Sequence, residues 1–269
     1  MNNTTSTDSP FVMAVVSGKG GVGKSMTSVN SAEMLQNLGY SVALIDADIG
    51  LSNCATLMNE QVSFTVAHWI KGECSLEDLP QMTGDITLVT ASNDPGHHTF
   101  DPELMADALD QVMKYVAPAM DFILIDTPAG VGEMTLWGLD RAHVGALILV
   151  DEPAAVSDVY RLCKYIYKLD PHYNFAGIVN FAEDEESAQS TIGRFNNILN
   201  YFMEKKIPAL GFVPASIAIK NSVKDQQTIL AGNPGDPILH EFRYIAENIA
   251  GMAGKNIKPQ AEAEPKPAL

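Results

Sequence analysis

The sequence predicts an α/β fold in which a doubly wound, mostly parallel sheet is flanked by helices on both faces. Short apolar runs alternate with helical stretches along most of the chain, and a glycine-rich loop separates the first run from the first helix. Alternation of this kind implies right-handed crossovers between parallel strands. With 269 residues, of which 46% are hydrophobic, the chain is long enough for one large domain with a sizeable core.

The first strand–helix–strand unit is the most clearly marked. Residues 11–17 (FVMAVVS) form a continuous apolar run, as expected for a strand that is buried on both faces. Residues 24–38 are expected to form a helix, and Gly39 follows directly, in the position that glycine favours just past a helix C-terminus. Residues 41–45 (SVALI) are the second predicted strand.

The same alternation continues along the rest of the chain. Short apolar runs predict buried strands, and longer periodic stretches predict helices. Further strands are expected at 86–89, 122–125, 146–150, 175–179 and 210–213, and further helices at 102–115, 155–169, 188–202 and 238–250.

We expect one ordered domain over residues 11–253, between two irregular ends. Residues 1–10 are polar and lack the basic and apolar segments of a signal peptide, so they are expected to be a flexible lead-in. Residues 254–269 are rich in proline, alanine and charge and are expected to be disordered.

The last predicted helix has an apolar face and an opposite face of mixed charge. The apolar face consists of Ile238, Phe242, Ile245 and Ile249. The opposite face carries two glutamates and one arginine, whereas lipid binding favours a basic face. We therefore expect this helix to dock on the sheet, with membrane association weak or absent.

The chain is strongly acidic. Its 17 Lys plus Arg against 33 Asp plus Glu give a formal net charge of −16. Such a surface repels phosphate backbones, so sequence-independent binding of nucleic acid is disfavoured. The three cysteines, Cys54, Cys74 and Cys163, are far apart and form no CxxC motif, which argues against a zinc ribbon or a bridging iron–sulfur site and suits a reducing cytoplasm.

The glycine-rich loop matches the phosphate-binding pattern G-x-x-x-x-G-K-[ST]. It consists of Gly18, Lys19, Gly20, Gly21, Val22, Gly23, Lys24 and Ser25, and Met26, next in the chain, is counted with it as nucleotide-binding. The glycines let backbone N–H groups converge on phosphate oxygens, and the helix N-terminus adds positive potential. We expect Lys24 to reach the β- and γ-phosphates of ATP, and the Ser25 hydroxyl to ligate Mg²⁺.

Three aspartates stand at the ends of two predicted strands. Asp46 and Asp48 follow the strand at 41–45, and Asp126 follows the strand at 122–125. In an open parallel sheet, ligands bind outside the carboxyl ends of the strands. Of the first two aspartates, one could organise the metal shell while the other orients the attacking water, and Asp126 is expected to face the Mg²⁺ hydration shell.

Together, these features resemble the MinD/ParA ATPases. The loop with its second lysine, the Asp-x-Asp strand end and the later Asp-Thr-Pro-Ala-Gly segment carry the resemblance, which spans almost the whole predicted domain. Those ATPases have a deviant Walker A loop and dimerise around two ATP molecules. The resemblance implies that Lys19 reaches across a homodimer to the partner's phosphates, that Asp48 positions the hydrolytic water, and that Asp46 and Asp126 lie near Mg²⁺.

Within that family, two stretches are similar to narrower groups. Residues 46–53 (DADIGLSN) look like the MinD branch, and residues 151–160 (DEPAAVSDVY) look like the FlhG group, also called FleN or YlxH, which controls the number and placement of bacterial flagella. By the same resemblance, Asn180 reads adenine and Pro214 belongs to the second adenine-side loop. This implies an ATP-driven positioning switch in the cytoplasm, recruitable to a cell pole, whose slow hydrolysis is stimulated by a protein partner.

Other functions stay open at this level. The chain departs from the family pattern at Cys54-Ala55, where a Val-Asp or Leu-Asp pair is common, so a paralogue that positions chemotaxis, pilus or secretion machinery is an alternative. The function of a DNA-partition ATPase is disfavoured by the negative net charge. The function of a metal-cluster carrier is disfavoured because the sequence has no CxxC motif. Residues 158–169 combine basic side chains and tyrosines and form a candidate partner surface, whereas Trp137 is either an interface anchor or a core residue.

Overall fold

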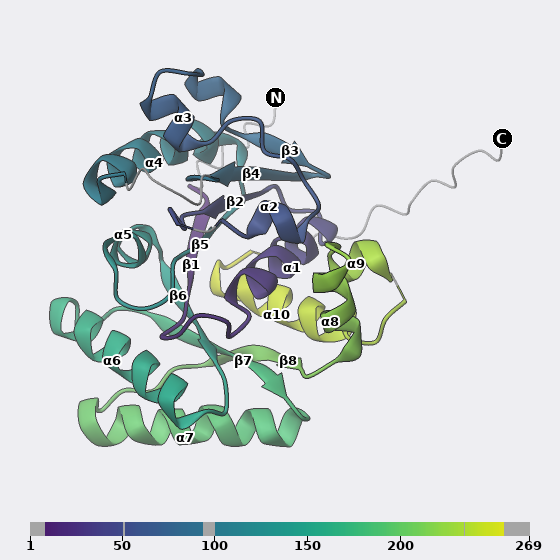
Figure 1. Ribbon diagram of the computed structural model, residues 1–269. Helices are drawn as coiled ribbons and strands as arrows, with labels where there is room; N and C mark the ends of the chain where they lie inside the picture. The colour runs from purple at the N-terminus through teal and green to yellow at the C-terminus, as the bar shows by residue number, and fades with distance from the viewer. Residues whose placement is uncertain (1–8, 51, 94–99, 234, 256–269) are drawn as a thin grey trace, which may run out of the picture.

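The computed structural model of the protein describes residues 9–50, 52–93, 100–233 and 235–255. Within these residues, an eight-stranded sheet runs through the centre of the molecule in the order β3-β4-β2-β5-β1-β6-β7-β8 (Figure 1). All neighbouring strands are parallel except β3 and β4. The strands are β1 Phe11–Val16, β2 Val42–Asp46, β3 Gln81–Thr83, β4 Ile86–Thr90, β5 Phe122–Asp126, β6 Val144–Leu149, β7 Phe175–Ala182 and β8 Ala209–Pro214.

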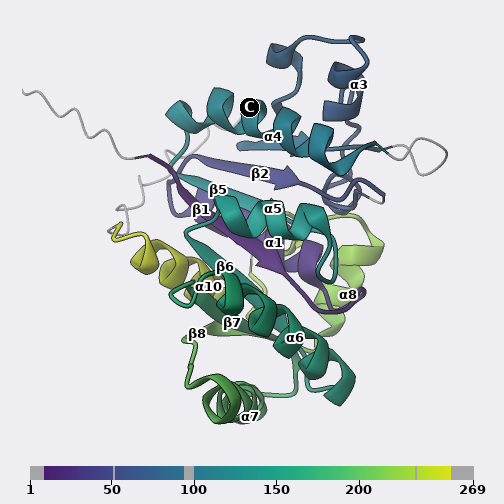
Figure 2. The same ribbon diagram turned by 90° about the vertical axis from the view of Figure 1, so that its left-hand side faces the viewer.

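Helices cover both faces of this sheet, which gives three layers (Figures 1 and 2). One face packs against α1 Lys24–Asn37, α2 Cys54–Leu57, α8 Ile217–Lys224, α9 Ile229–Gly232 and α10 Leu239–Met252. The other face, turned toward the viewer in Figure 2, packs against α3 Val66–Ile70, α4 Pro102–Val116, α5 Glu133–Arg141, α6 Pro153–Leu169 and α7 Glu185–Met203. Two short 3-10 helices are η1 Leu76–Asp78 and η2 Ala117–Ala119. The predicted α/β architecture is confirmed.

The central strands are buried on both faces because each face meets a helical layer. Along β1, Met13 and Val15 belong to the core beneath α1 and α10, while Ala14 and Val16 belong to the core beneath α5 and α6. Alternate side chains of a strand point to opposite faces, so a strand between two cores must be apolar throughout. This is why the continuous apolar runs were reliable markers of strands.

Helix α10 docks on the sheet as predicted. Phe242, Ile245 and Ile249 are each no more than 1% exposed and belong to the core shared with α1 and β8. Within the described residues, no helix is long and apolar enough to cross a membrane. The expectations for residues 1–8 and 256–269 lie outside the described residues.

Several elements were not predicted, and α5 is the most informative of them. Gly138 lies in the interior of α5, where glycine is unfavourable for a helix. A Cβ atom at this position would lie 2.8 Å from Thr127 Cγ2, so glycine allows the helix to approach β5 closely. Helices α2 and α9 are only four residues long, and β3 is a three-residue antiparallel edge strand, so their sequence periodicity is too short to recognise.

The topology brings the predicted site residues to one edge of the sheet. Strand β5 lies between β1 and β2, and Asp126 pairs in register with Val15 on one side and with Asp46 on the other. The loop from β1 to α1 therefore begins beside the two aspartates. This edge, at the carboxyl ends of the strands, is where an open α/β sheet binds ligands.

Candidate functional site

The loop between β1 and α1 is held in a conformation that needs glycine. Gly21 and Gly23 have φ angles of +78° and +86°, in the left-handed region that residues with a Cβ rarely adopt. Gly23 also lies directly against Asn180, whose Nδ2 donates a hydrogen bond of 2.7 Å to the carbonyl oxygen of Val22. A Cβ on Gly23 would lie only 2.1 Å from Asn180 Nδ2.

Two glycines of this loop allow a matched test of that geometry. We expect Gly23→Ala to destabilise the protein by about 2–4 kcal/mol, because it combines a strained φ with a steric clash. Gly20→Ala is the control, since a Cβ on Gly20 would meet no atom within 4 Å. Denaturant unfolding of both variants measures the difference, and equal destabilisation would contradict the proposed loop conformation.

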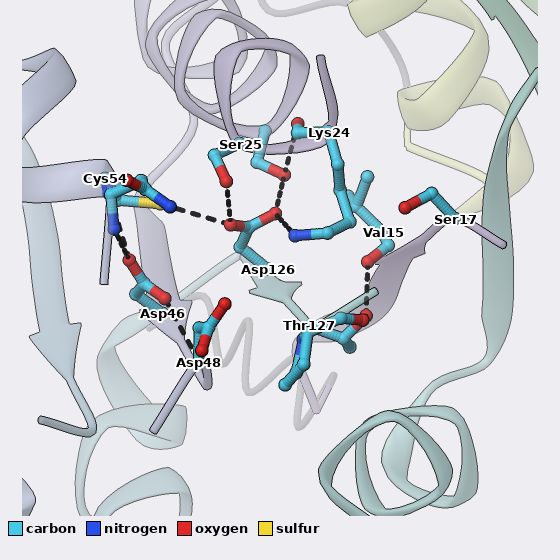
Figure 3. A network of polar contacts seen from close by, with 12 residues as sticks. Val15, Ser17, Lys24, Ser25, Asp46, Asp48, Cys54, Asp126 and Thr127 are labelled. Carbon is cyan, nitrogen blue, oxygen red and sulfur yellow. Dashed lines mark hydrogen bonds and ion pairs between the residues drawn. The ribbon is translucent and has the colours of Figure 1, made fainter. Parts of the chain in front are cut away.

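The carboxylate of Asp126 is the centre of the site (Figure 3). Its Oδ1 accepts hydrogen bonds from Lys24 Nζ at 2.9 Å and from Ser28 Oγ at 2.8 Å. Its Oδ2 accepts a hydrogen bond of 2.6 Å from Ser25 Oγ, with Cys54 Sγ at 3.6 Å. The first five residues of α1 thus place an amine and two hydroxyls on one carboxylate that is 1% exposed.

Asp46, the last residue of β2, is fully buried beside Asp126. Its Oδ2 accepts hydrogen bonds from Ser52 Oγ at 2.6 Å and from the backbone N–H groups of Asn53 and Cys54, both at 2.9 Å. Burial, and then the negative charge of Asp126, raise the pKa of Asp46 to about 6. The bonds to Ser52 and the backbone act in the opposite direction but do not cancel these effects.

This raised pKa predicts a stability change between about pH 4 and pH 6. The folded nucleotide-free protein holds the Asp46 proton up to about pH 6, whereas an unfolded chain releases it near pH 4. The folded state therefore binds this proton more tightly, and the stability it confers, about 3 kcal/mol, is lost as the pH rises through that window. The side chain introduced by Asp46→Asn cannot titrate, so the free energy of unfolding of wild type relative to this variant should fall across the window. If the free energies of unfolding of the two proteins changed in parallel with pH, the raised pKa of Asp46 would be ruled out.

The buried negative charge of the site is not fully balanced by Lys24. Burial alone lowers the pKa of the Lys24 amine, but the charges of Asp126 and Asp46 and the hydrogen bond to Asp126 outweigh it and raise the pKa, so Lys24 is charged. One amine faces two buried carboxylates. The hydroxyl of Ser25 and Oδ2 of Asp126 are oxygen donors of the kind that Mg²⁺ prefers, so these residues fit a magnesium ion.

A cavity of about 510 Å³ opens above these groups. Gly20, Gly21, Gly23, Lys24, Ser25, Met26 and Asp48 are among its lining residues, together with Lys19. Asp48 lies past the end of β2, and its Oδ1 accepts a hydrogen bond of 3.0 Å from the Gly50 backbone. The structure therefore brings the loop, both lysines and Asp48 together around one space.

A sequence model of the ParA family, described as NUBPL iron-transfer P-loop NTPase, matches residues 10–250. The chain belongs to the ParA family of P-loop NTPases. It is 27% identical over 239 residues to the antiactivator FleN of Pseudomonas aeruginosa, covering 88% of this chain and 85% of that protein. It is 29% identical over 261 residues to the flagellum site-determining protein YlxH of Helicobacter pylori, covering 96% of this chain and 86% of that protein.

The fold is also similar to solved structures of this family. The septum site-determining protein MinD of Pyrococcus horikoshii, complexed with Mg-ADP, aligns with a TM-score of 0.72 over 91% of this chain and 98% of that chain, at 22% identity. At this identity, the likeness concerns the fold. The family match, the two relatives and this fold likeness together confirm the expected resemblance to MinD/ParA proteins and to the FleN and YlxH group.

The other predicted site residues of this ParA-family chain take distinct positions. Lys19 forms an ion pair with Glu152: its Nζ lies 3.0 Å from Glu152 Oε2, and both side chains are at least half exposed. Asn180 lies beneath the loop rather than on the cavity wall, because its amide contacts Val22 and the backbone of Phe181. Pro214 is the last residue of β8, in register with Ala182.

Phe181 is a residue of this site that sequence reasoning missed. It lines the cavity, its side chain is 49% exposed, and its φ of +59° is in the left-handed region that bulky residues avoid. Backbone strain of this kind often accompanies function. The sequence signal was an aromatic residue directly after Asn180 at a predicted strand end.

Trp137 belongs to the core of the fold. Its side chain is 6% exposed, and its Nε1 donates a hydrogen bond of 2.9 Å to Asp110. Of the two roles open to Trp137, the structure thus supports the core residue rather than the interface anchor.

Proposed function

We propose that this P-loop NTPase is an ATP-driven dimerisation switch that hydrolyses ATP slowly and, like FlhG/FleN proteins, controls the number and placement of flagella. One observation carries the proposal. Lys24 and Ser25 converge on the buried carboxylate of Asp126 beneath a cavity of about 510 Å³ whose rim carries a second, exposed lysine, Lys19. The names of the relatives FleN and YlxH, an antiactivator and a flagellum site-determining protein, support the flagellar role.

In this proposal, the loop binds the phosphates of ATP through its backbone N–H groups and Lys24. Ser25, Asp126 and Asp46 are the residues that would hold Mg²⁺, which when bound would neutralise phosphate charge. Asp48 lines the cavity and accepts a hydrogen bond from the attacking water, which orients that water. Asn180 and Pro214 flank the adenine side, and the exposed ring of Phe181 offers a flat surface for the base.

Lys19 acts between two copies of the chain. Its ion pair with Glu152 is exposed on both sides, and such pairs contribute little free energy, so the lysine is free to leave Glu152. In the ATP-bound homodimer, it reaches the phosphates of the other copy, where its charge stabilises charge in the transition state. Dimerisation and hydrolysis are thereby coupled, and a protein partner stimulates the slow reaction.

Two further elements of the proposal concern location and cargo. We place the protein in the cytoplasm, with recruitment to a cell pole, on the strength of the FleN and YlxH relatives and the three unpaired cysteines. A ParA-type DNA role is disfavoured by the net charge of −16. An iron–sulfur role is disfavoured because the sequence contains no CxxC motif.

A pull-down from cell lysate tests the cargo. The bait is Asp48→Ala, which we expect to retain ATP, and the matched control is Lys24→Ala, which we expect not to bind it. Enrichment of flagellar basal-body or flagellar-regulator proteins on Asp48→Ala alone is the expected result. If chemotaxis, pilus, secretion or chromosome proteins are enriched instead, the flagellar assignment is wrong while the switch mechanism survives.

A further inference from the structure

Cys54 is enclosed with the two buried aspartates, and the proposed magnesium chemistry makes no use of its thiol. Ligand atoms of Asp46, Cys54 and Asp126 all lie within 4.8 Å of one another, and all three residues are buried. They come from three elements: β2, α2 and β5. Figure 3 shows Cys54 beside Asp126. The Cys54 sulfur lies 3.6 Å from Asp126 Oδ2. Mg²⁺ prefers oxygen ligands, so a thiol at this place calls for a different ion.

The hydrogen bonds of the two carboxylates leave oxygen atoms for such an ion. Oδ1 of Asp126 is engaged by Lys24 and Ser28, whereas Oδ2 is on the side of Ser25 and Cys54. Oδ2 of Asp46 accepts three hydrogen bonds, whereas Oδ1 accepts one, a long bond of 3.2 Å from the Asp48 backbone. A cation can therefore join the cluster without breaking the ion pair between Lys24 and Asp126.

An independent observation beside the cluster also points to a ligand. The hydroxyl of Thr90 is buried and has no hydrogen-bond partner among the described residues. Thr90 pairs in register with Asp46 at the carboxyl end of β4, so both side chains lie on the same face of the sheet. Leaving a buried hydroxyl without a partner is unfavourable, and a nearby cation, directly or through its water, would satisfy its oxygen.

We propose that the Asp46–Cys54–Asp126 cluster of the nucleotide-free protein binds a thiophilic divalent cation of the Zn²⁺ class. One thiolate, two carboxylates and a water or hydroxyl complete the four-coordinate set that zinc favours. The thiol proton passes to solvent as the sulfur–metal bond forms. The ion enters through the cavity above Ser25, which Asn53 and Thr56 also line. Because it uses Asp126 Oδ2, it competes with Mg·nucleotide, and such a metal is an inhibitory ligand of this site.

The test titrates the nucleotide-free protein with Cd²⁺, a probe whose bond to a thiolate gives an ultraviolet charge-transfer band. All variants carry Cys74→Ser, because Cys74 is partly exposed near Glu73 and Asp78 and could bind the probe on its own. Cys54→Ala and Cys54→Ser remove the candidate ligand. Cys163→Ala is the matched control, a buried cysteine that lies outside the cluster.

We expect one Cd²⁺ per chain with a thiolate band in the Cys74→Ser protein and in the Cys163→Ala control. Both Cys54 variants should lose the band and bind Cd²⁺ at least about 100-fold more weakly, since even indirect ligand contacts are worth 10–100-fold. Thermal unfolding confirms that each variant is folded, and Cys54→Ser keeps the result interpretable if the alanine variant is not. A band that survives in the Cys54 variants, or no band in the Cys74→Ser protein, overturns the proposal. Neither result depends on ATP binding, so the proposed switch is tested separately.

Discussion

Lys24→Ala is expected to abolish nucleotide binding. The amine is 2.9 Å from Asp126 Oδ1, and it is the cation that balances the two buried carboxylates in the nucleotide-free protein. Loss of a buried, hydrogen-bonded charge that also binds phosphate costs about 3 kcal/mol or more, which corresponds to at least about 100-fold in affinity for Mg·ATP. Isothermal titration with a non-hydrolysable ATP analogue measures this change.

The same substitution should also destabilise the protein without nucleotide. It leaves Asp126 buried without its cation, which typically costs about 3–5 kcal/mol. Lys19→Ala is the matched control in the same loop. Because Lys19 and Glu152 are both exposed, we expect it to leave stability nearly unchanged and to weaken nucleotide binding far less than Lys24→Ala. If Lys19→Ala weakened binding as much as Lys24→Ala, the separate roles of the two lysines would be wrong.

Asp48→Ala is expected to bind ATP but to lose its hydrolysis. Asp48 lines the cavity, and its Oδ1 accepts a hydrogen bond of 3.0 Å from the Gly50 backbone. Loss of a group that positions or deprotonates the attacking water typically costs at least about 100-fold in rate. Phosphate release under saturating ATP measures the loss, and unchanged affinity for the analogue shows that binding is intact. A variant that hydrolyses ATP at the wild-type rate would remove Asp48 from the mechanism.

The sequence allowed the centre of the site to be predicted because its determinants are local. The loop from Gly18 to Ser25 lies within one strand–turn–helix unit, and Asp46 and Asp126 end strands whose apolar runs are continuous. In a parallel sheet, such strand ends meet at one edge. This rule places Asp46 and Asp126 at the same edge of the sheet. It does not predict that β2 and β5 are direct neighbours, as the structure shows them to be.

The rest of the site depends on contacts between distant segments, which no local pattern encodes. Cys54 joins the aspartates only because residues 52–54 fold back and donate to Asp46 Oδ2. Phe181 lines the cavity through a left-handed backbone angle that its residue type does not favour. Trp137 is buried in α5, a helix that the sequence pattern did not reveal, and its Nε1 donates to Asp110 of α4, 27 residues earlier in the chain.

The central claim is that ATP joins two copies of the chain, and the mass of the Asp48→Ala protein in solution tests it most directly. Light scattering coupled to size-exclusion chromatography compares this variant with Mg·ATP, with Mg·ADP and without nucleotide. The switch predicts twice the mass of the 29.0 kDa chain with Mg·ATP only, and the mass of one chain when Lys24→Ala is added. A single-chain mass with saturating Mg·ATP, while the nucleotide is bound, would contradict the dimerisation switch.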